Sequence, residues 1–373
     1  MKSITQRIIT VGTFPYSRAI LIQIQLQTEG IDCFLVTKDS ITPVHIADLR
    51  VLEKDVAKAM KIIESTLSDY GKAKEKAVKS IKTIRRILVP VDFSSLSLHA
   101  CRFAISLASK FKAEVKLLHV FYNPAIDITP YDDHYAYQVK LSNSLREIEK
   151  NARISLIKLE QKLQTWCKNE KVHDVRITTG LANGESADEI VDYSKKYRPA
   201  IIIMGTRGLT KGAHPLGRVT TKVIEQSSIP VFAIPDGSIK KIDEIKNLMY
   251  ATDFDPSDYS AINRLLHILS PLDIHLHCVH VSVGVKRPWD PVKMEELKEH
   301  LSREYADNKV SFSMQVSPDI IYGIESYIRN NAIDAVALVN HKKGPLEKWF
   351  APSMTKKIFT ETGKPLFVFH ASA

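Results

Sequence analysis

The sequence predicts an α/β protein, in which two tandem doubly wound parallel-sheet domains follow a small α+β unit of order βαββα. From residue 84 onward, short apolar runs alternate with longer amphipathic segments, which is typical of strands that alternate with helices. This pattern then occurs a second time, as expected for a repeat. Three stretches match between the halves: Pro90-Val-Asp-Phe-Ser with Ala251-Thr-Asp-Phe-Asp, His119-Val120 with His280-Val281, and Ile229-Pro-Val-Phe-Ala-Ile with Lys364-Pro-Leu-Phe-Val-Phe.

Length and composition fit a multidomain globular protein. A chain of 373 residues is long enough for two or three domains, and its 44% hydrophobic and 25% charged residues are globular averages. The net charge is +10, and much of it lies in one run that we interpret as a solvated linker. Contact of this run with nucleic acid or an anionic membrane is the less favoured interpretation. The run contains Lys72, Lys74, Lys76, Lys79, Lys82, Arg85 and Arg86.

Cysteine usage and the N-terminal residues predict a cytoplasmic protein. The four cysteines are scattered and form no Cys-x-x-Cys pair, which favours a reducing compartment over a disulfide framework. The first residues lack the apolar segment of a signal peptide, and no apolar run is long enough for a membrane helix.

The N-terminal unit is predicted to contain three strands and two helices. We expect strands at 7–13, 31–36 and 44–51, a helix from Pro15 to Gly30, and a second helix over 53–70. Nothing in this unit indicates catalysis. The predicted boundaries along the chain are 1–70 for the small unit, 71–83 for the basic linker, 84–236 for the first repeat and 237–373 for the second.

The first repeat is predicted to be an open doubly wound sheet. A strand ending at Asp92 leads into a helix from Ser95 with an apolar stripe at helical spacing. The later elements are strands at 114–121, 175–178, 200–204 and 229–234, and helices over 138–169, 185–197 and beyond residue 218. Ligands of such sheets bind at the carboxyl ends of the strands. Asp92, Val120 and Gly205 all fall there.

A glycine-rich connection follows the strand at 200–204. Glycines at 205, 208, 212 and 217 separate this strand from the next helix, so backbone amides and the helix N-terminus are able to approach an anion. The loop is neither a Walker A sequence nor a Gly-x-Gly-x-x-Gly fingerprint. From the residues alone, an ordinary strand-to-helix connection and a phosphate-binding loop remain open.

The set of motifs resembles the universal stress protein family. The set comprises Pro-Val-Asp-Phe-Ser, a strand ending His-Val, Met-Gly-x-x-Gly, Gly-x-Val-Thr and a closing Ile-Pro-Val strand, and it covers 84–373 as two copies. The resemblance implies an adenine nucleotide alpha hydrolase-like fold, a cytoplasmic location, and pairing through the last strands, Val231 to Ile234 and Leu366 to Phe369. It also implies either ATP binding, with or without Mg²⁺, or a kind that binds no nucleotide.

The same resemblance implies which residues would contact the nucleotide. Asp92 matches the acid that meets the nucleoside, and Val120 matches a position whose backbone contacts adenine. Two positions depart from the ATP-binding pattern: Gly208 and Gly217 enclose one residue fewer than it does, and Arg218 replaces a small hydroxyl residue. The implied set is Pro90, Val91, Asp92, Val120, Met204, Gly205, Arg207, Gly208, Gly217, Arg218, Val219 and Thr220.

The second copy is predicted to be degenerate and to serve in pairing. Alignment of Met354-Thr355 with Val219-Thr220 places Asn340 opposite Gly205, Lys343 opposite Gly208 and Pro352 opposite Gly217, with bulky Trp349 and Phe350 in the loop. Asp253 remains, and we interpret it as a helix cap or turn former.

The N-terminal unit resembles a small prokaryotic family of signal-transducing domains. The stretches that carry this resemblance lie at Val11 to Phe14, Glu29 to Leu35 and Leu52 to Ala59.

Other clusters of polar residues are predicted to be structural. His275 and His277 share one face of a strand while Cys278 and His280 take the other, so the four cannot converge on a metal ion. No Gly-x-Ser-x-Gly elbow and no paired catalytic carboxylates occur, so no metal and no catalytic residue is predicted.

Three functions remain open. The favoured one is a cytoplasmic stress-response regulator that binds adenine nucleotide in its first copy, pairs its copies internally or as a homodimer, and acts on a protein partner that the sequence does not name. The alternatives are a stress protein without a ligand that works through protein contacts, and a slow ATPase.

Overall fold

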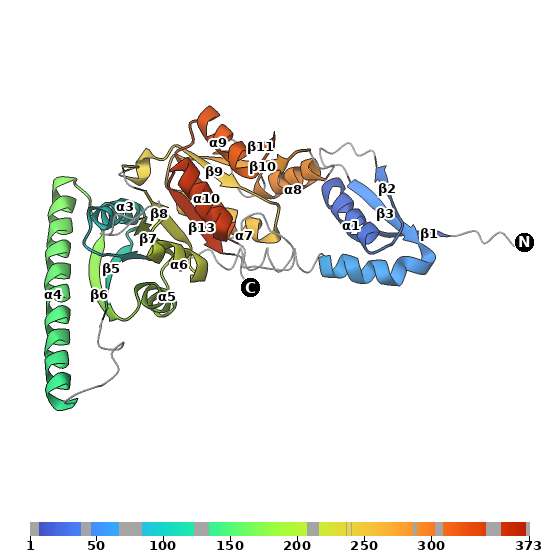
Figure 1. Ribbon diagram of the computed structural model, residues 1–373. Coiled ribbons are helices and arrows are strands. Elements are labelled where there is room, and N and C mark those ends of the chain that lie inside the picture. Colours follow the sequence, from blue (N-terminus) through green and yellow to red (C-terminus); the bar gives the residue numbers. More distant parts are fainter. Residues whose placement is uncertain are drawn as a thin grey trace, which may run out of the picture.

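The computed structural model describes residues 7–38, 46–66, 84–122, 134–206, 216–235, 237–239, 241–285, 289–302, 309–340 and 352–370. The predicted fold class is confirmed. A three-stranded antiparallel sheet forms near the N-terminus, and a single ten-stranded sheet of order β11-β10-β9-β12-β13-β8-β7-β4-β5-β6 runs through the rest of the chain (Figure 1). No helix in the described ranges combines the length and apolar character needed to cross a membrane.

The N-terminal unit has the predicted order of elements. It contains β1 (Ile8–Pro15), α1 (Tyr16–Thr28), β2 (Cys33–Lys38), β3 (Ile46–Leu52), a 3-10 turn at Glu53–Asp55 and a helix over 56–66. Pro15 ends β1 instead of beginning α1, and Gly30 follows α1 with a positive φ of 75°, the left-handed geometry that glycine favours after a helix. The unit has a core of its own around Ile22, Leu26 and Leu49.

Each half of the large sheet has the same strand order. The first half contains β4 (Arg86–Pro90), β5 (Glu114–Phe121), β6 (Arg176–Asn183), β7 (Ile201–Gly205) and β8 (Val231–Ile234). The second contains β9 (Asn247–Ala251), β10 (His275–Val283), β11 (Val310–Ser317), β12 (Ala335–Asn340) and β13 (Leu366–His370). Pairing within each half is parallel, so the carboxyl ends of its strands meet at one edge.

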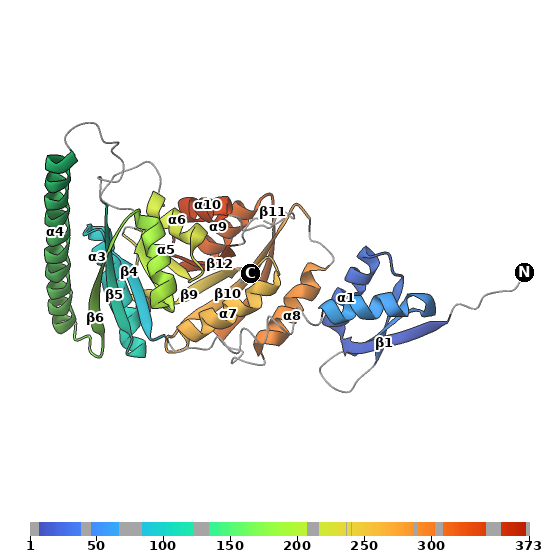
Figure 2. The ribbon, with the colours of Figure 1, turned by 90° about the horizontal axis from the view of Figure 1, so that it is seen from below.

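Helices cover both faces of the sheet (Figures 1 and 2). One apolar core joins the sheet to α3 (Ser95–Phe111), α4 (His134–Asn169), α7 (Pro256–Leu269) and α8 (Asp290–Ser302). The other joins it to α5 (Ser186–Tyr197), α6 (Arg218–Gln226), α9 (Ile320–Asn330) and α10 (Pro352–Thr362). The N-terminal unit lies at the second-repeat end of the molecule, where α1 contacts α8.

The two halves join through their last strands. β8 and β13 pair antiparallel, with Phe232 opposite Phe367 and their rings stacked at 3.7 Å. The ring of Phe103 in α3 lies 5.0 Å from that of Phe232, which extends this aromatic contact into the core. The last-strand pairing that was expected between copies is therefore made inside one chain.

The structure corrects the alignment of the second copy by one residue. The amide of Ala200 donates to Arg86 O in the first half, and the amide of Asp334 donates to Asn247 O at the same place in the second. This register puts Val339, and not Asn340, opposite Gly205. Because α10 still matches α6 at Thr355 and Thr220, the connection before α10 is one residue longer than its counterpart.

Candidate functional site

The candidate site lies at the carboxyl ends of β4, β5 and β7, where the order of the strands reverses. Its first part is the turn between β4 and α3. The Ser94 amide donates to Asp92 Oδ1 at 3.0 Å, and the Ser94 hydroxyl caps the helix by accepting from the Ser97 amide at 3.1 Å. Phe93 between them has a left-handed φ of 63°. Among the described residues Ser94 is the hydrogen-bond partner of Asp92, and this bond uses one of two carboxylate oxygens.

The backbone of Val120 faces the same edge. The carbonyl of Leu118 accepts from the Val91 amide at 2.8 Å, and the β4–β5 ladder ends at the Pro90–Leu118 pair. Backbone groups two residues apart on a strand point to the same side. The amide and carbonyl of Val120 therefore point toward the space beyond the end of β4.

Gly205 is the position where a side chain does not fit. A Cβ at this residue would lie 3.1 Å from the backbone carbon and oxygen of Leu96 in the first turn of α3. The lack of a side chain thus lets α3 approach the end of β7 closely. In the second copy Val339 takes this place and is buried in the core. Gly205 is half-buried, so part of its backbone is accessible at this edge of the sheet.

The start of α6 faces the end of β7. Gly217 is the N-cap of α6 and donates its amide to Thr206 O, while the Thr220 hydroxyl donates to Gly205 O at 3.0 Å. Met204 and Thr220 are buried, Val219 is half-buried, and Arg218 is exposed. Of the predicted site residues, Arg207 and Gly208 lie outside the described residues.

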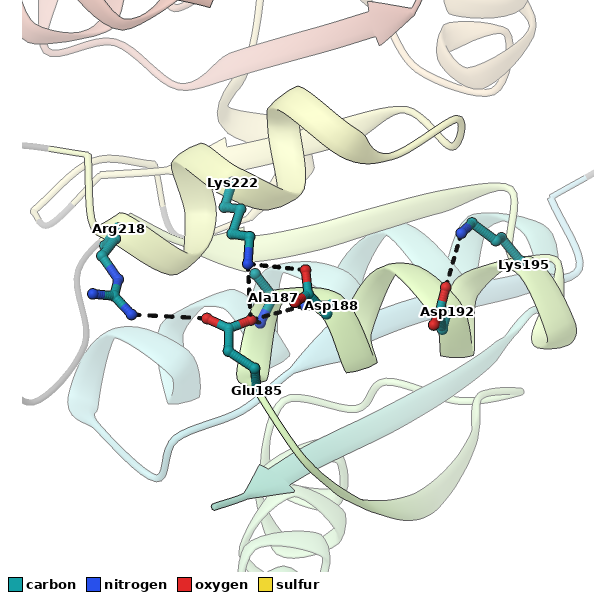
Figure 3. A network of polar contacts seen from close by, with 7 residues as sticks. All are labelled: Glu185, Ala187, Asp188, Asp192, Lys195, Arg218 and Lys222. Atoms are coloured by element: carbon teal, nitrogen blue, oxygen red, sulfur yellow. Dashed lines mark hydrogen bonds and ion pairs between the residues drawn. The ribbon is translucent and has the colours of Figure 1, made fainter. Parts of the chain in front are cut away.

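A network of charged side chains links the start of α6 to α5 (Figure 3). Glu185 is the N-cap of α5, and its Oε2 accepts from the amides of Ala187 at 2.9 Å and Asp188 at 3.1 Å. Lys222 Nζ lies 3.3 Å from the same oxygen and 2.9 Å from Asp188 Oδ1. Arg218 Nη2 lies 3.8 Å from Glu185 Oε1. Sequence reasoning placed Glu185 inside a helix and missed this network.

The environment keeps Glu185 ionised. Partial burial acts to raise the pKa of this carboxyl, but the Asp188 amide and the Lys222 ammonium outweigh it, so the pKa lies below its usual range. The site therefore holds a fixed negative charge beside the helix end that would receive phosphate.

The second copy has a buried polar cluster at the corresponding edge. Asp258, in the first turn of α7, accepts from Tyr250 Oη at 2.6 Å and from Thr252 Oγ1 at 2.5 Å. The corresponding first-copy residues are Val89 on β4 and Val91 just after this strand. Asp253 accepts from the Asp255 amide at 3.2 Å, which is the turn-forming role that was expected. Asp92 makes the same turn, so this aspartate does not distinguish the copies.

The histidines at the strand ends are structural counterparts of one another. Nδ1 of His119 donates to Val91 O at 2.8 Å, and Nδ1 of His280 donates to Thr252 O at 2.9 Å. His275 and His277 lie on the other face of β10, with ring centroids 4.7 Å apart. Cys278 is fully buried, and the described residues contain no cluster of three or more metal ligands.

Comparisons with known proteins point to one family. The model of the universal stress protein family matches residues 83–235. A universal stress protein of Methanocaldococcus jannaschii is 30% identical over 154 residues, which are 40% of this chain and 81% of that protein. One of Bacillus subtilis is 28% identical over 156 residues, which are 40% of this chain and 97% of that protein.

A solved structure shares the fold over a longer range. The crystal structure of a universal stress protein from Archaeoglobus fulgidus covers 78% of this chain and 97% of its own, with a TM-score of 0.57. The two sequences are 18% identical, so this likeness concerns the fold alone.

Proposed function

This chain belongs to the universal stress protein family, and from that premise we propose that its first copy binds an adenine nucleotide and that the protein regulates other proteins instead of acting as a catalyst. Membership of the family supports a role in stress response. In the proposed complex, the backbone of Val120 meets adenine, Asp92 accepts from the ribose hydroxyls, and the amides at the start of α6 receive phosphate oxygens.

One observation carries the choice of the first copy. A Cβ at Gly205 would lie 3.1 Å from the backbone of Leu96, so glycine permits this close approach of α3 and leaves the half-buried backbone at the end of β7 without a side chain. Val339 fills the corresponding place in the second copy. The proposal therefore assigns ligand binding to the first copy and pairing to the second. ATP, with or without Mg²⁺, is the expected ligand.

The first test of the proposal is whether the purified protein contains bound adenine nucleotide. The purified protein is denatured, and its supernatant is analysed by ion-exchange chromatography for adenine nucleotide. Titration calorimetry with Mg-ATP then measures the affinity of protein stripped of ligand. About one equivalent of nucleotide per chain, or one calorimetric site, is expected. An empty protein that gives no heat with Mg-ATP would refute the proposal.

A pair of matched variants tests the location of the site. Asp92→Asn removes the charge but keeps an oxygen that accepts from the Ser94 amide, so the turn is maintained. Asp253→Asn makes the same change in the second copy, where the Asp255 amide is the donor. We expect Asp92→Asn to weaken ATP binding about tenfold or more, as loss of a charge-assisted hydrogen bond predicts. Asp253→Asn should leave affinity unchanged, and equal effects of the two would contradict the assignment.

The second candidate is a stress protein without a ligand. Arg218 favours it, because the guanidinium already has a carboxylate partner in Glu185 at 3.8 Å. The calorimetric titration distinguishes the two. A slow ATPase would be recognised by phosphate release above the level of the Asp92→Asn variant.

We further propose that residues 1–70 form a separate signalling-type module, with 71–83 as a linker to the repeats at 84–236 and 237–373. We also propose that the protein acts in the cytoplasm. Support for the module comes from its own sheet and its own core around Ile22, Leu26 and Leu49. The partner of the whole chain is a protein that the sequence does not identify.

A further inference from the structure

We propose that Glu185 is a specificity-determining residue that competes with the phosphate groups of the ligand, and so makes the site disfavour highly charged nucleotides. This inference rests on the proposed function, because it concerns the charge preference of the same site. Figure 3 shows the contacts that carry it: the side chains of Glu185 and Asp188, at the start of α5, face those of Arg218 and Lys222 on α6.

The carboxylate of Glu185 is held in one orientation. Two backbone amides at the start of α5 and the ammonium of Lys222 share its Oε2, at 2.9 to 3.3 Å. The other oxygen, Oε1, is left facing Arg218 across 3.8 Å. A group fixed in this way cannot turn away when an anion arrives, so its negative charge is a permanent feature of the site.

The two cations on α6 differ in how firmly they are held. Lys222 contacts two carboxylates, Glu185 and Asp188, and its side chain is 34% exposed. Arg218 is the first residue of α6, its ion pair with Glu185 spans 3.8 Å, and its side chain is 90% exposed. In the described part of the chain, their ion pairs are all with carboxylates of α5. Arg218 is thus the cation that a phosphate group is able to recruit.

Recruitment of Arg218 has an electrostatic cost that grows with ligand charge. A phosphate at the start of α6 takes the guanidinium from Glu185 and then lies near a carboxylate that remains ionised. Repulsion between like charges rises with each added phosphate group. Adenosine, which carries no phosphate, is not repelled by Glu185. Glu185 therefore reduces the advantage that the triphosphate would otherwise gain from the helix end, which is specificity through a repulsive element.

Glu185→Gln tests this role while preserving the fold. The amide oxygen of glutamine still accepts from the amides of Ala187 and Asp188, so the cap of α5 is kept. The matched control is Asp192→Asn, which removes the same charge from the same helix. Asp192 pairs with Lys195 at 2.8 Å, away from α6 (Figure 3). Thermal unfolding of each variant verifies that it is folded before binding is measured.

The measurement is calorimetric titration of the full chain with adenosine, ADP and ATP at low and high salt. Glu185→Gln should bind ATP about three- to tenfold tighter than the wild type, ADP by a smaller factor, and adenosine equally. The gain should shrink at high salt because screening weakens charge repulsion. It should also shrink in the Arg218→Gln background, as coupling between the two side chains requires. Asp192→Asn should match the wild type.

The outcomes separate the two proposals. If the wild type binds nucleotide and Glu185→Gln follows Asp192→Asn for all three ligands, Glu185 has no such role and the proposed function stands. An equal gain for adenosine and ATP also overturns the inference, because it would reflect a change of shape and not of charge. If no protein in the series binds any nucleotide, the proposed function fails and the inference fails with it.

Discussion

Replacement of Asp258 by asparagine should change how the stability of the second copy depends on pH. The carboxyl is fully buried in α7 and accepts hydrogen bonds from Tyr250 Oη and Thr252 Oγ1. Burial and, after it, the charge of Asp253 raise the pKa of Asp258 to about 7, although the two hydroxyl donors act in the opposite direction. Asparagine keeps the shape and one acceptor oxygen but does not titrate.

The sign follows from the two protonation states. An unfolded aspartate has a pKa near 3.9, so between about pH 4 and pH 7 the folded protein binds this proton more tightly. The contribution of the protonated Asp258 carboxyl to the stability of the folded protein is fully present below about pH 4 and is lost as pH rises through about 7. A difference of about three pKa units corresponds to at most about 4 kcal/mol. The free energy of unfolding of Asp258→Asn, relative to wild type, should therefore rise between pH 5 and pH 8 by on the order of 2 kcal/mol.

Urea unfolding at several pH values, followed by circular dichroism, measures this difference. The variant and the wild type share all other titrating groups, so the difference between their free energies of unfolding isolates the effect of Asp258. Asp192→Asn serves as the control for loss of an exposed charge and should run parallel to the wild type. A difference between Asp258→Asn and wild type that stays constant from pH 5 to pH 8 would refute the assignment of a neutral buried carboxyl.

Two further predictions concern packing. Phe232→Ala removes the ring that stacks on Phe367 at 3.7 Å and lies 5.0 Å from Phe103, so it should lower the free energy of unfolding by about 3–5 kcal/mol in urea unfolding. A loss below about 1 kcal/mol would show that the seam, the antiparallel pairing of β8 with β13, does not unfold together with the core. Gly205→Ala places a Cβ against the backbone of Leu96, so it should lower stability by about 1–3 kcal/mol and also weaken ATP binding. Unchanged affinity in that variant, measured by the same calorimetry, would place the ligand elsewhere.

The sequence predicted the elements because their periodicity is clear, but it did not predict the register of β12. Ala335–Asn340 is buried along its whole length, so no alternation of polar and apolar residues marks its two faces. An alignment based on Thr220 and Thr355 consequently shifted the strand by one residue. Hydrogen bonds to β9 and β13 set the register, and these depend on contacts distant in sequence.

The charged network around Glu185 and the buried polar cluster around Asp258 were missed for different reasons. The contacts of Glu185 with Arg218 and Lys222 arise from the packing of α5 on α6, which no local pattern indicates. Asp258 left a signal in the sequence. Tyr250 on β9 and Thr252 just after this strand correspond to Val89 and Val91 of the first copy, so a polar partner was required inside that core.

The differences between the copies also determine which halves are able to pair. Arg264 of α7 takes the place that Phe103 has in α3, and its guanidinium donates to Ala200 O across the seam at 3.1 Å. Pairing of two first copies would replace this cation with a second phenylalanine and remove the donor of that carbonyl. The seam thus favours a first copy joined to a second copy. Because β8 and β13 pair with each other and both are interior strands of the ten-stranded sheet, neither has a free edge for a second chain. Each chain carries one candidate nucleotide site.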